Sequence, residues 1–345
     1  MIRPNNLKKR DIIGLISPSS PLAGMVPHRV KNGIEMLVSL GFKVKVGKNA
    51  LLVNDYIAGD PKKRAEDIHD FFRDSEITAI ISFTGGNHSN QVLDYLDFEL
   101  IKKNPKIFLG YSDITVLHFA FLTQCNLVTF YGPSALNQFA ENPKMLPYTE
   151  EYFKKALMQA DPIGEVCPSG EYTEEVLNWF KKEDLKRKRK MKKNSGWEWL
   201  QEGNAKGLIL GGCISSMMHL RGTKFWPSFK NKILFWEISE GDSIEKGESL
   251  ANIDTHLMDL KLTGVFKEIK GMIVGRPFGY TSKEVEKLKE MIKKYLRDCS
   301  IPVLFNVDIG HTDPMITVPL GVEVEIDSKR NTFNFLESGT KYYEK

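Results

Sequence analysis

Residues 107–115 read Ile-Phe-Leu-Gly-Tyr-Ser-Asp-Ile-Thr, and a helical pattern continues from there to Leu122. The apolar run predicts a buried strand. The small residue, the serine and the immediate helix start resemble the strand–turn–helix elbow that exposes a nucleophilic hydroxyl. A helix N-terminus at this point would also stabilise negative charge. A simpler interpretation is that Ser112 is a helix N-cap, a position where serine is favoured. The stretch therefore indicates an α/β fold and makes Ser112 a candidate nucleophile.

The segments around this stretch alternate short apolar runs with helical spacing. Such alternation indicates a parallel sheet covered by helices on both faces. In the first half we expect strands at 11–16, 42–46, 77–83 and 106–109, and helices at 28–40, 61–73, 89–96 and 113–122.

Residues 161–205 break this rhythm. They contain a highly charged run, KKEDLKRKRKMKK, at 181–193, followed by the aromatic turn Ser-Gly-Trp-Glu-Trp at 195–199. Periodic apolar structure resumes at 205 and continues to a terminal hairpin near 322–336. A chain of 345 residues exceeds what one hydrophobic core usually supports. We predict an N-terminal α/β domain with the nucleophile (1–165), a connecting loop (166–204) and a C-terminal β/α domain (205–345).

The composition is that of an ordinary globular protein, with 41% hydrophobic residues and a net charge of +4. This balance gives no reason to expect a nucleic acid polymer as partner. No run approaches the roughly 20 apolar residues of a membrane span, so no membrane partner is expected. The four cysteines are far apart and favour free thiols in the cytoplasm. The sequence contains no HExxH, phosphate-loop or dinucleotide motif, so we expect no metal and no cofactor.

A serine nucleophile needs a base and a group that orients the base. In open α/β sheets the ligand site lies beyond the C-terminal ends of the strands. Glu237 directly ends the apolar run 233–236, whereas Glu240 falls on the turn before Gly241. His311 lies in the loop after the strand expected at 302–307, although an ordinary surface histidine would also fit there. The chain order Ser112, Glu237, His311 is one of several in which such triads occur.

An acyl-transfer site also needs backbone amides that point at the oxyanion. The strand at 77–83 leads into Thr84-Gly85-Gly86-Asn87, and a Gly-Gly turn lets the backbone approach a ligand closely. The amide of Asp113 would be the second donor. A tight strand-to-helix turn is the ordinary alternative for the glycines.

Three further residues are open to two interpretations. Cys213 follows a Gly-Gly pair at a strand end, where a buried and inert thiol is the simpler interpretation. Trp197 and Trp199 lie in a glycine-flanked polar segment. They would either stack on an aromatic ligand group or attach the loop to a domain.

Several segments together resemble the LD-carboxypeptidase family of serine peptidases, most closely its microcin C immunity branch. The ordered set covers nearly the whole chain, from about residue 11 to about residue 326. The matching segments are GLISPSSP (14–21), FTGGN (83–87) with Ser89-Asn90, GYSDIT (110–115), GLILGG (207–212), ILFWE (233–237), GMIVG (271–275) and residues 302–314.

The resemblance implies an N-terminal flavodoxin-like parallel-sheet domain and a C-terminal swivelling β/α domain, in a homodimer without metal. The family's catalytic triad falls on Ser112, Glu237 and His311. Its oxyanion hole falls on the backbone of Gly86 and Asp113.

The resemblance also implies a substrate class. The murein-cleaving branch usually carries an arginine-containing segment after its Gly-Gly turn, whereas Asn87 and its neighbours are nearer to the immunity branch. By this likeness Asn87 contacts substrate, and Trp197 or Trp199 stacks on a nucleotide base. The family often has asparagine where this chain has Cys213.

The expected activity is hydrolysis of an amide bond near a carboxyl terminus, in a small peptide or peptidyl-nucleotide such as an aminoacyl-nucleotide conjugate of the microcin type. A murein tetrapeptide LD-carboxypeptidase of cell-wall recycling is the alternative enzyme. A non-catalytic ligand-binding protein is the alternative from another class.

Overall fold

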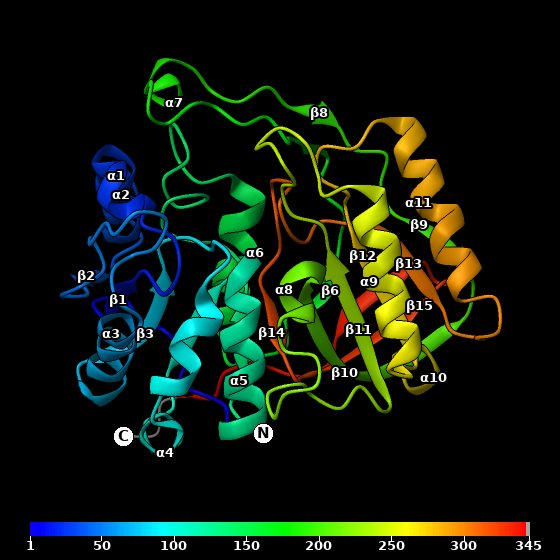
Figure 1. The fold of residues 1–345 in the computed structure, drawn as a ribbon, viewed down its shortest axis with the longest axis horizontal. Helices are drawn as coiled ribbons and strands as arrows, with labels where there is room; N and C mark the ends of the chain where they lie inside the picture. The colour runs from blue at the N-terminus through cyan, green and yellow to red at the C-terminus, as the bar shows by residue number, and fades with distance from the viewer. Residues whose placement is uncertain (343–345) are drawn as a thin grey trace.

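A computed structural model describes residues 1–342 as two large β-sheets, each covered by helices and packed side by side, with a small two-stranded sheet besides (Figure 1). The first sheet has a parallel core in the order β2-β1-β3-β4-β5, which is the flavodoxin-like order. Its strands are β1 (Ile12–Ile16), β2 (Lys43–Val46), β3 (Ile77–Ser82), β4 (Ile107–Gly110) and β5 (Thr129–Tyr131), with β14 (Val318–Leu320) antiparallel to β5 at the edge.

The helices of this unit cover both faces of the sheet. The side chains of α3, α4 and α5 belong to one buried cluster, and those of α1, α2 and α6 to another on the opposite face. The local sequence explains why α3 begins where it does, because Asp60 caps it and Pro61 occupies its first turn. These helices are α1 (Leu22–Met25), α2 (Pro27–Ser39), α3 (Pro61–Arg73), η1 (Ser89–Tyr95), α4 (Phe98–Lys103), η2 (Ser112–Ile114), α5 (Thr115–Cys125) and α6 (Pro147–Leu157).

The second sheet has eight strands in the order β6-β16-β15-β10-β11-β12-β13-β9, and its central four run parallel. Its strands are β6 (Gly164–Val166), β9 (Glu198–Gln201), β10 (Asn204–Cys213), β11 (Lys232–Glu237), β12 (Gly271–Gly275), β13 (Val303–Val307), β15 (Glu323–Asp327) and β16 (Thr332–Phe335). Its helices are α8 (Ile214–Met218), α9 (Leu250–Leu262), α10 (Val265–Glu268) and α11 (Ser282–Tyr295). The expected two-domain α/β fold is therefore confirmed.

The segment between the two sheets is more ordered than a plain connecting loop. It contributes β6 and β9, which form the two edges of the second sheet. Between them it makes an excursion through β7 (Glu171–Tyr172), α7 (Glu183–Lys186) and β8 (Lys192–Lys193). Figure 1 shows α7 and β8 at the top of the molecule. In the other direction, β14 returns to the first sheet from within the predicted second domain. The domain boundaries at 165 and 205 stay a prediction.

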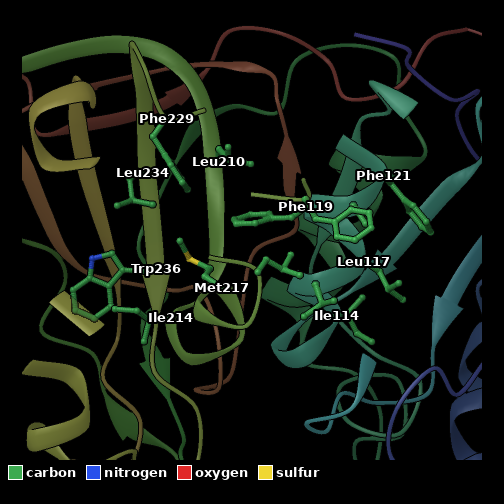
Figure 2. Packing of buried hydrophobic residues seen from close by; sticks show 14 of the residues in the cluster. Ile114, Leu117, Phe119, Phe121, Leu210, Ile214, Met217, Phe229, Leu234 and Trp236 are labelled. Atoms are coloured by element: carbon green, nitrogen blue, oxygen red, sulfur yellow. The ribbon is translucent and has the colours of Figure 1, made fainter. Parts of the chain in front are cut away.

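The two units share one hydrophobic core where α5 meets the second sheet. Figure 2 shows Phe119 of α5 directed toward residues of β10, β11 and α8, and its ring centroid lies 6.2 Å from that of Phe229. Phe119, Trp236 and Met217 are fully buried. Since α5 starts directly after the candidate nucleophile, this packing fixes Ser112 relative to the second sheet. No helix within residues 1–342 is long and apolar enough to cross a membrane.

Candidate active site

Ser112 lies in a strained turn between β4 and α5. Its φ angle is +64°, in the left-handed region that costs an L-residue about 1 kcal/mol or more. Its side chain does not cap α5, because Ile114 occupies the N-cap position of that helix. Such strain is common where a side chain must be presented to a ligand. The geometry therefore favours the elbow interpretation over the helix-cap interpretation.

Both ends of the Ser112 residue are held by hydroxyl groups. Its backbone N–H donates to the phenol oxygen of Tyr131 at 3.1 Å. Its carbonyl accepts from Oγ1 of Thr115 at 2.6 Å, and that oxygen in turn accepts from the backbone N–H of Cys213 at 3.1 Å. The nucleophile turn is thus hydrogen-bonded to the second sheet through Thr115.

The predicted acid and base meet at the C-terminal ends of β11 and β13. Nδ1 of His311 lies 2.7 Å from Oε2 of Glu237, whose side chain is fully buried. The other carboxylate oxygen of Glu237 accepts from the Tyr131 hydroxyl at 2.5 Å. Gly310, with φ of +102°, passes so close to this carboxylate that a Cβ there would collide with it. Glycine at 310 is therefore required for the pair to form.

Two carboxylates act on the His311 imidazole. Burial alone would lower the pKa of His311, but Glu237 and Glu240 outweigh burial and raise that pKa to about 9. Oε2 of Glu240 lies 3.4 Å from Nε2, the ring nitrogen that would accept the serine proton. Within residues 1–342 no hydrogen bond links the Ser112 hydroxyl to His311. In enzymes without bound substrate, catalytic hydrogen bonds are often long and tighten only when substrate binds.

The Gly85-Gly86 turn lies against the nucleophile. A Cβ on Gly85 would stand 2.8 Å from Cβ of Ser112 and 3.1 Å from the backbone nitrogen of Asp113. Gly86 has φ of +142°, which other residues rarely adopt. The structure thus brings the predicted oxyanion segment to the turn that carries Ser112. Asn87 is exposed and does not line the cavity next to His311.

The Asp113 side chain has a role that the sequence did not suggest. Its carboxylate is fully buried and accepts from Oγ of Ser19 at 2.6 Å and from the backbone N–H groups of His88 and Ser89 at 2.9 and 2.8 Å. It therefore ties the loop after Gly85-Gly86 to the start of α5. This leaves the Asp113 amide beside the Gly-Gly turn.

A cavity of about 260 Å³ opens beside His311 and Tyr111. Its aromatic wall includes Trp179 and the 61% exposed Phe180, and Arg29 lies 4.4 Å from the Trp179 ring. Tyr111 packs on His311 with ring centroids 5.0 Å apart. The cavity thus combines the candidate base with a flat aromatic surface.

The tryptophans nominated from the sequence lie elsewhere. The Trp197 ring packs against Phe333, and Nε1 of Trp199 donates to the Asn331 side chain at 2.8 Å. Neither ring lines the cavity, because Trp199 lies on β9, which pairs with β13, and Trp197 directly precedes that strand and packs on Phe333 of β16. These contacts favour the interpretation in which the pair attaches the loop to a domain. The signal that would have found Trp179 is the adjacent aromatic pair Trp179-Phe180 directly before the charged run.

Ion pairs hold the charged run over the cavity. Arg189 lies 2.6 Å from Glu141 and 2.7 Å from Asp313. Arg187 pairs with Glu175 at 2.8 Å. The run, which would be solvated in an isolated loop, is therefore attached to the cavity wall by its arginines.

The remaining polar candidates do not add a second nucleophile or a metal site. Burial and the nearby Glu237 carboxylate raise the pKa of the Cys213 thiol to about 12, so the buried-thiol interpretation fits. Among the described residues, no group of three or more His, Cys, Asp or Glu side chains is arranged to hold a metal ion.

Two conserved domain patterns match the chain, the LD-carboxypeptidase N-terminal domain over residues 13–132 and the LD-carboxypeptidase C-terminal domain over residues 206–326. The chain belongs to the LD-carboxypeptidase family. Because this is a family of serine peptidases, the chain is a peptidase of the serine class.

Three relatives span nearly the full chain. The microcin C7 self-immunity protein MccF of Escherichia coli is 32% identical over 330 residues, which cover 95% of this chain and 93% of that protein. The putative carboxypeptidase YocD of Bacillus subtilis is 32% identical, with 95% of this chain and 97% of that protein covered. A probable murein peptide carboxypeptidase of Bacillus subtilis is 30% identical, with 96% and 93% covered.

Solved structures agree with these relatives. MccF in complex with aspartyl sulfamoyl adenosine superposes with a TM-score of 0.91 at 31% identity, covering 99% of this chain and 100% of that one. A tryptophan-to-phenylalanine mutant of MccF in complex with adenosine monophosphate gives a TM-score of 0.91 at 30% identity, with the same coverage.

Proposed function

We propose that this protein is a serine carboxypeptidase-type hydrolase with Ser112, Glu237 and His311 as its catalytic triad. The observation that carries the proposal is the 2.7 Å contact between His311 and buried Glu237. The hydroxyl of Tyr131 connects this pair to the strained Ser112 turn through two hydrogen bonds. A buried carboxylate on Nδ1 orients the imidazole and stabilises the imidazolium that forms when Nε2 takes a proton. This arrangement of carboxylate and imidazole serves catalysis only where a nucleophile lies nearby.

In the proposed reaction, Nε2 of His311 takes the proton from the Ser112 hydroxyl as Oγ attacks the carbonyl carbon of the amide. The carbonyl electron pair moves to its oxygen, which accepts hydrogen bonds from the backbone amides of Gly86 and Asp113. The imidazolium then gives its proton to the leaving nitrogen, and the C–N bond breaks. Water, deprotonated by His311, hydrolyses the acyl-enzyme and restores Ser112.

For the substrate we propose an aminoacyl-nucleotide conjugate, as expected from the immunity-branch likeness. The support is a cavity that places an aromatic wall, Trp179 with Phe180, next to His311. A nucleobase can stack on such a surface while the amide bond reaches the histidine. The complexes of MccF with a sulfamoyl nucleoside and with adenosine monophosphate support the same class of ligand. We assign the stacking role to Trp179 in place of Trp197 or Trp199.

The test is Ser112→Ala, assayed for hydrolysis of an aminoacyl-nucleotide conjugate by release of the free amino acid. Loss of at least about a thousand-fold in kcat is expected, since removing a triad member leaves only binding and oxyanion stabilisation. Ser39→Ala, an exposed serine on α2, is the matched control and should retain full activity. Turnover by Ser112→Ala at the wild-type rate would contradict the assignment.

A murein LD-carboxypeptidase is the second candidate, because the probable murein peptide carboxypeptidase of Bacillus subtilis matches this chain almost from end to end. Release of D-alanine from a tetrapeptide, without action on the nucleotide conjugate, would favour it. A non-catalytic binder would instead leave Ser112 unlabelled by an active-site serine probe. The homodimer and the cytoplasmic location stay predictions.

A further inference from the structure

Tyr131 stands where the two sheets meet at the candidate active site. It ends β5 and is fully buried. Its ring packs edge-on against Phe235 of β11, with centroids 5.3 Å apart, and against Tyr111 at 6.3 Å. The phenol ring is therefore fixed by residues of both units, and its hydroxyl has a defined position.

That one hydroxyl contacts two parts of the proposed triad. Its proton goes to Oε1 of Glu237 at 2.5 Å, and its oxygen accepts the Ser112 N–H at 3.1 Å. Burial and the Glu237 carboxylate raise the pKa of the Tyr131 phenol well above its ordinary value, so it remains a donor. The direction of donation is therefore fixed in both hydrogen bonds: the Ser112 N–H donates to Tyr131, and the Tyr131 hydroxyl donates to Glu237.

The hydroxyl also acts on the strained turn. A residue in the left-handed region persists only where its surroundings hold it. Thr115 holds the carbonyl of Ser112, and Tyr131 holds its amide. Without the phenol oxygen, the Ser112 amide would lose its acceptor within a buried site, which is costly.

We propose that Tyr131 is a positioning residue whose hydroxyl fixes the nucleophile turn and the triad carboxylate relative to each other across the two sheets. The proposal rests on the proposed function, since it assigns Tyr131 to the same Ser112–Glu237–His311 reaction. Tyr131 touches no reacting atom, so it acts through Ser112 and Glu237.

Tyr131→Phe tests the proposal because it removes the hydroxyl and keeps the ring. We expect kcat to fall about ten- to a hundred-fold with little change in KM, because misplacement of a catalytic group by about 1 Å can cost about a hundred-fold. Tyr152→Phe is the matched control. Tyr152 is also buried, and its hydroxyl also accepts a backbone N–H, but from Cys167 at 3.0 Å and not from a residue of the proposed triad.

A pH profile separates positioning from loss of stability. The charged groups that face His311 are Glu237 from β11, Glu240 from the following loop and Asp313 from its own loop, and the Cys213 thiol lies near Glu237. Removing the phenol donor concentrates negative charge on Glu237 and stabilises the imidazolium. The acid limb of kcat/KM against pH should therefore move to higher pH in Tyr131→Phe and stay in place in Tyr152→Phe.

The outcomes distinguish this proposal from the proposed function. If a fluorophosphonate probe labels wild-type Ser112 and Tyr131→Phe reacts at the wild-type rate with an unmoved acid limb, Tyr131 does not position the site. If Tyr131→Phe and Tyr152→Phe lose activity equally without a shift of the limb, the loss is structural and the proposal is overturned. If wild-type Ser112 itself is never labelled, the serine mechanism fails first.

Discussion

Replacing Glu240 with glutamine should lower the pKa of His311 and so increase the fraction of His311 that is neutral, and able to accept a proton, at pH 7. The Glu240 carboxylate lies 3.4 Å from Nε2 and, with Glu237, helps to raise the pKa of His311 to about 9 against the effect of burial. A base must be neutral to accept the serine proton. In the free enzyme, kcat/KM should therefore rise with pH up to about this pKa.

The size of the effect follows from the geometry of the pair. The Glu240 side chain is 41% exposed, so solvent screens its interaction with His311, and we take the dielectric constant of water for the interaction energy. Two unit charges at 3.4 Å then interact by about 1.2 kcal/mol at a dielectric constant of about 80, which is roughly one pKa unit. A fall of the His311 pKa from about 9 to about 8 raises its neutral fraction at pH 7 from about 1% to about 9%.

The assay is kcat/KM measured from about pH 6 to about pH 10. Glu240→Gln should move the acid limb down by about one pH unit and raise the rate at pH 7 up to about ten-fold. Glu245→Gln is the matched control, because Glu245 is exposed on the same loop and does not line the cavity. An acid limb that stays in place or moves up in Glu240→Gln would refute the electrostatic reasoning.

Two further predictions concern the cavity and the strained turn. Trp179→Ala should raise KM for a nucleotide conjugate about ten-fold or more, as expected for loss of base stacking. Trp199→Ala is the control and should leave KM unchanged. Equal effects of the two variants on KM in steady-state kinetics would exclude stacking on Trp179. Ser112→Gly should be about 1 kcal/mol more stable than Ser112→Ala in urea unfolding, because glycine tolerates φ of +64° without strain. A less stable glycine variant would show that the turn is not strained in solution.

Strand-end reasoning located much of the site because parallel strands end at one edge of their sheet. Ser112 follows β4 and Glu237 ends β11, and the structure brings both to Tyr131. The same rule applies to His311, which follows β13 and contacts Glu237. Nothing local marked Tyr131, because a tyrosine at the end of a short buried strand is ordinary core.

The cavity wall was beyond local reasoning for a different reason. Trp179 and Trp197 both stand in polar, glycine- or lysine-rich surroundings, so composition does not separate them. What separates them is long-range. Arg189 pairs with Glu141 and Asp313 and holds the charged run over the cavity. Trp197 instead packs on Phe333 of the second sheet, directly before β9 pairs with β13. Pairings between residues about 50 to more than 100 positions apart leave no periodic trace in the sequence.

The return of β14 to the first sheet has a consequence for the order of events on the ribosome. Val318 pairs with Tyr131, so the outer edge of β5 is covered by a segment made nearly two hundred residues later. Until that segment is made, the N-terminal half has an open strand edge at Tyr131, the residue whose hydroxyl accepts the Ser112 N–H. Glu237 and His311 are also made after this half, so the candidate active site is incomplete until the second unit is synthesised. A chain that terminates before residue 318 should be both inactive and prone to edge-to-edge association.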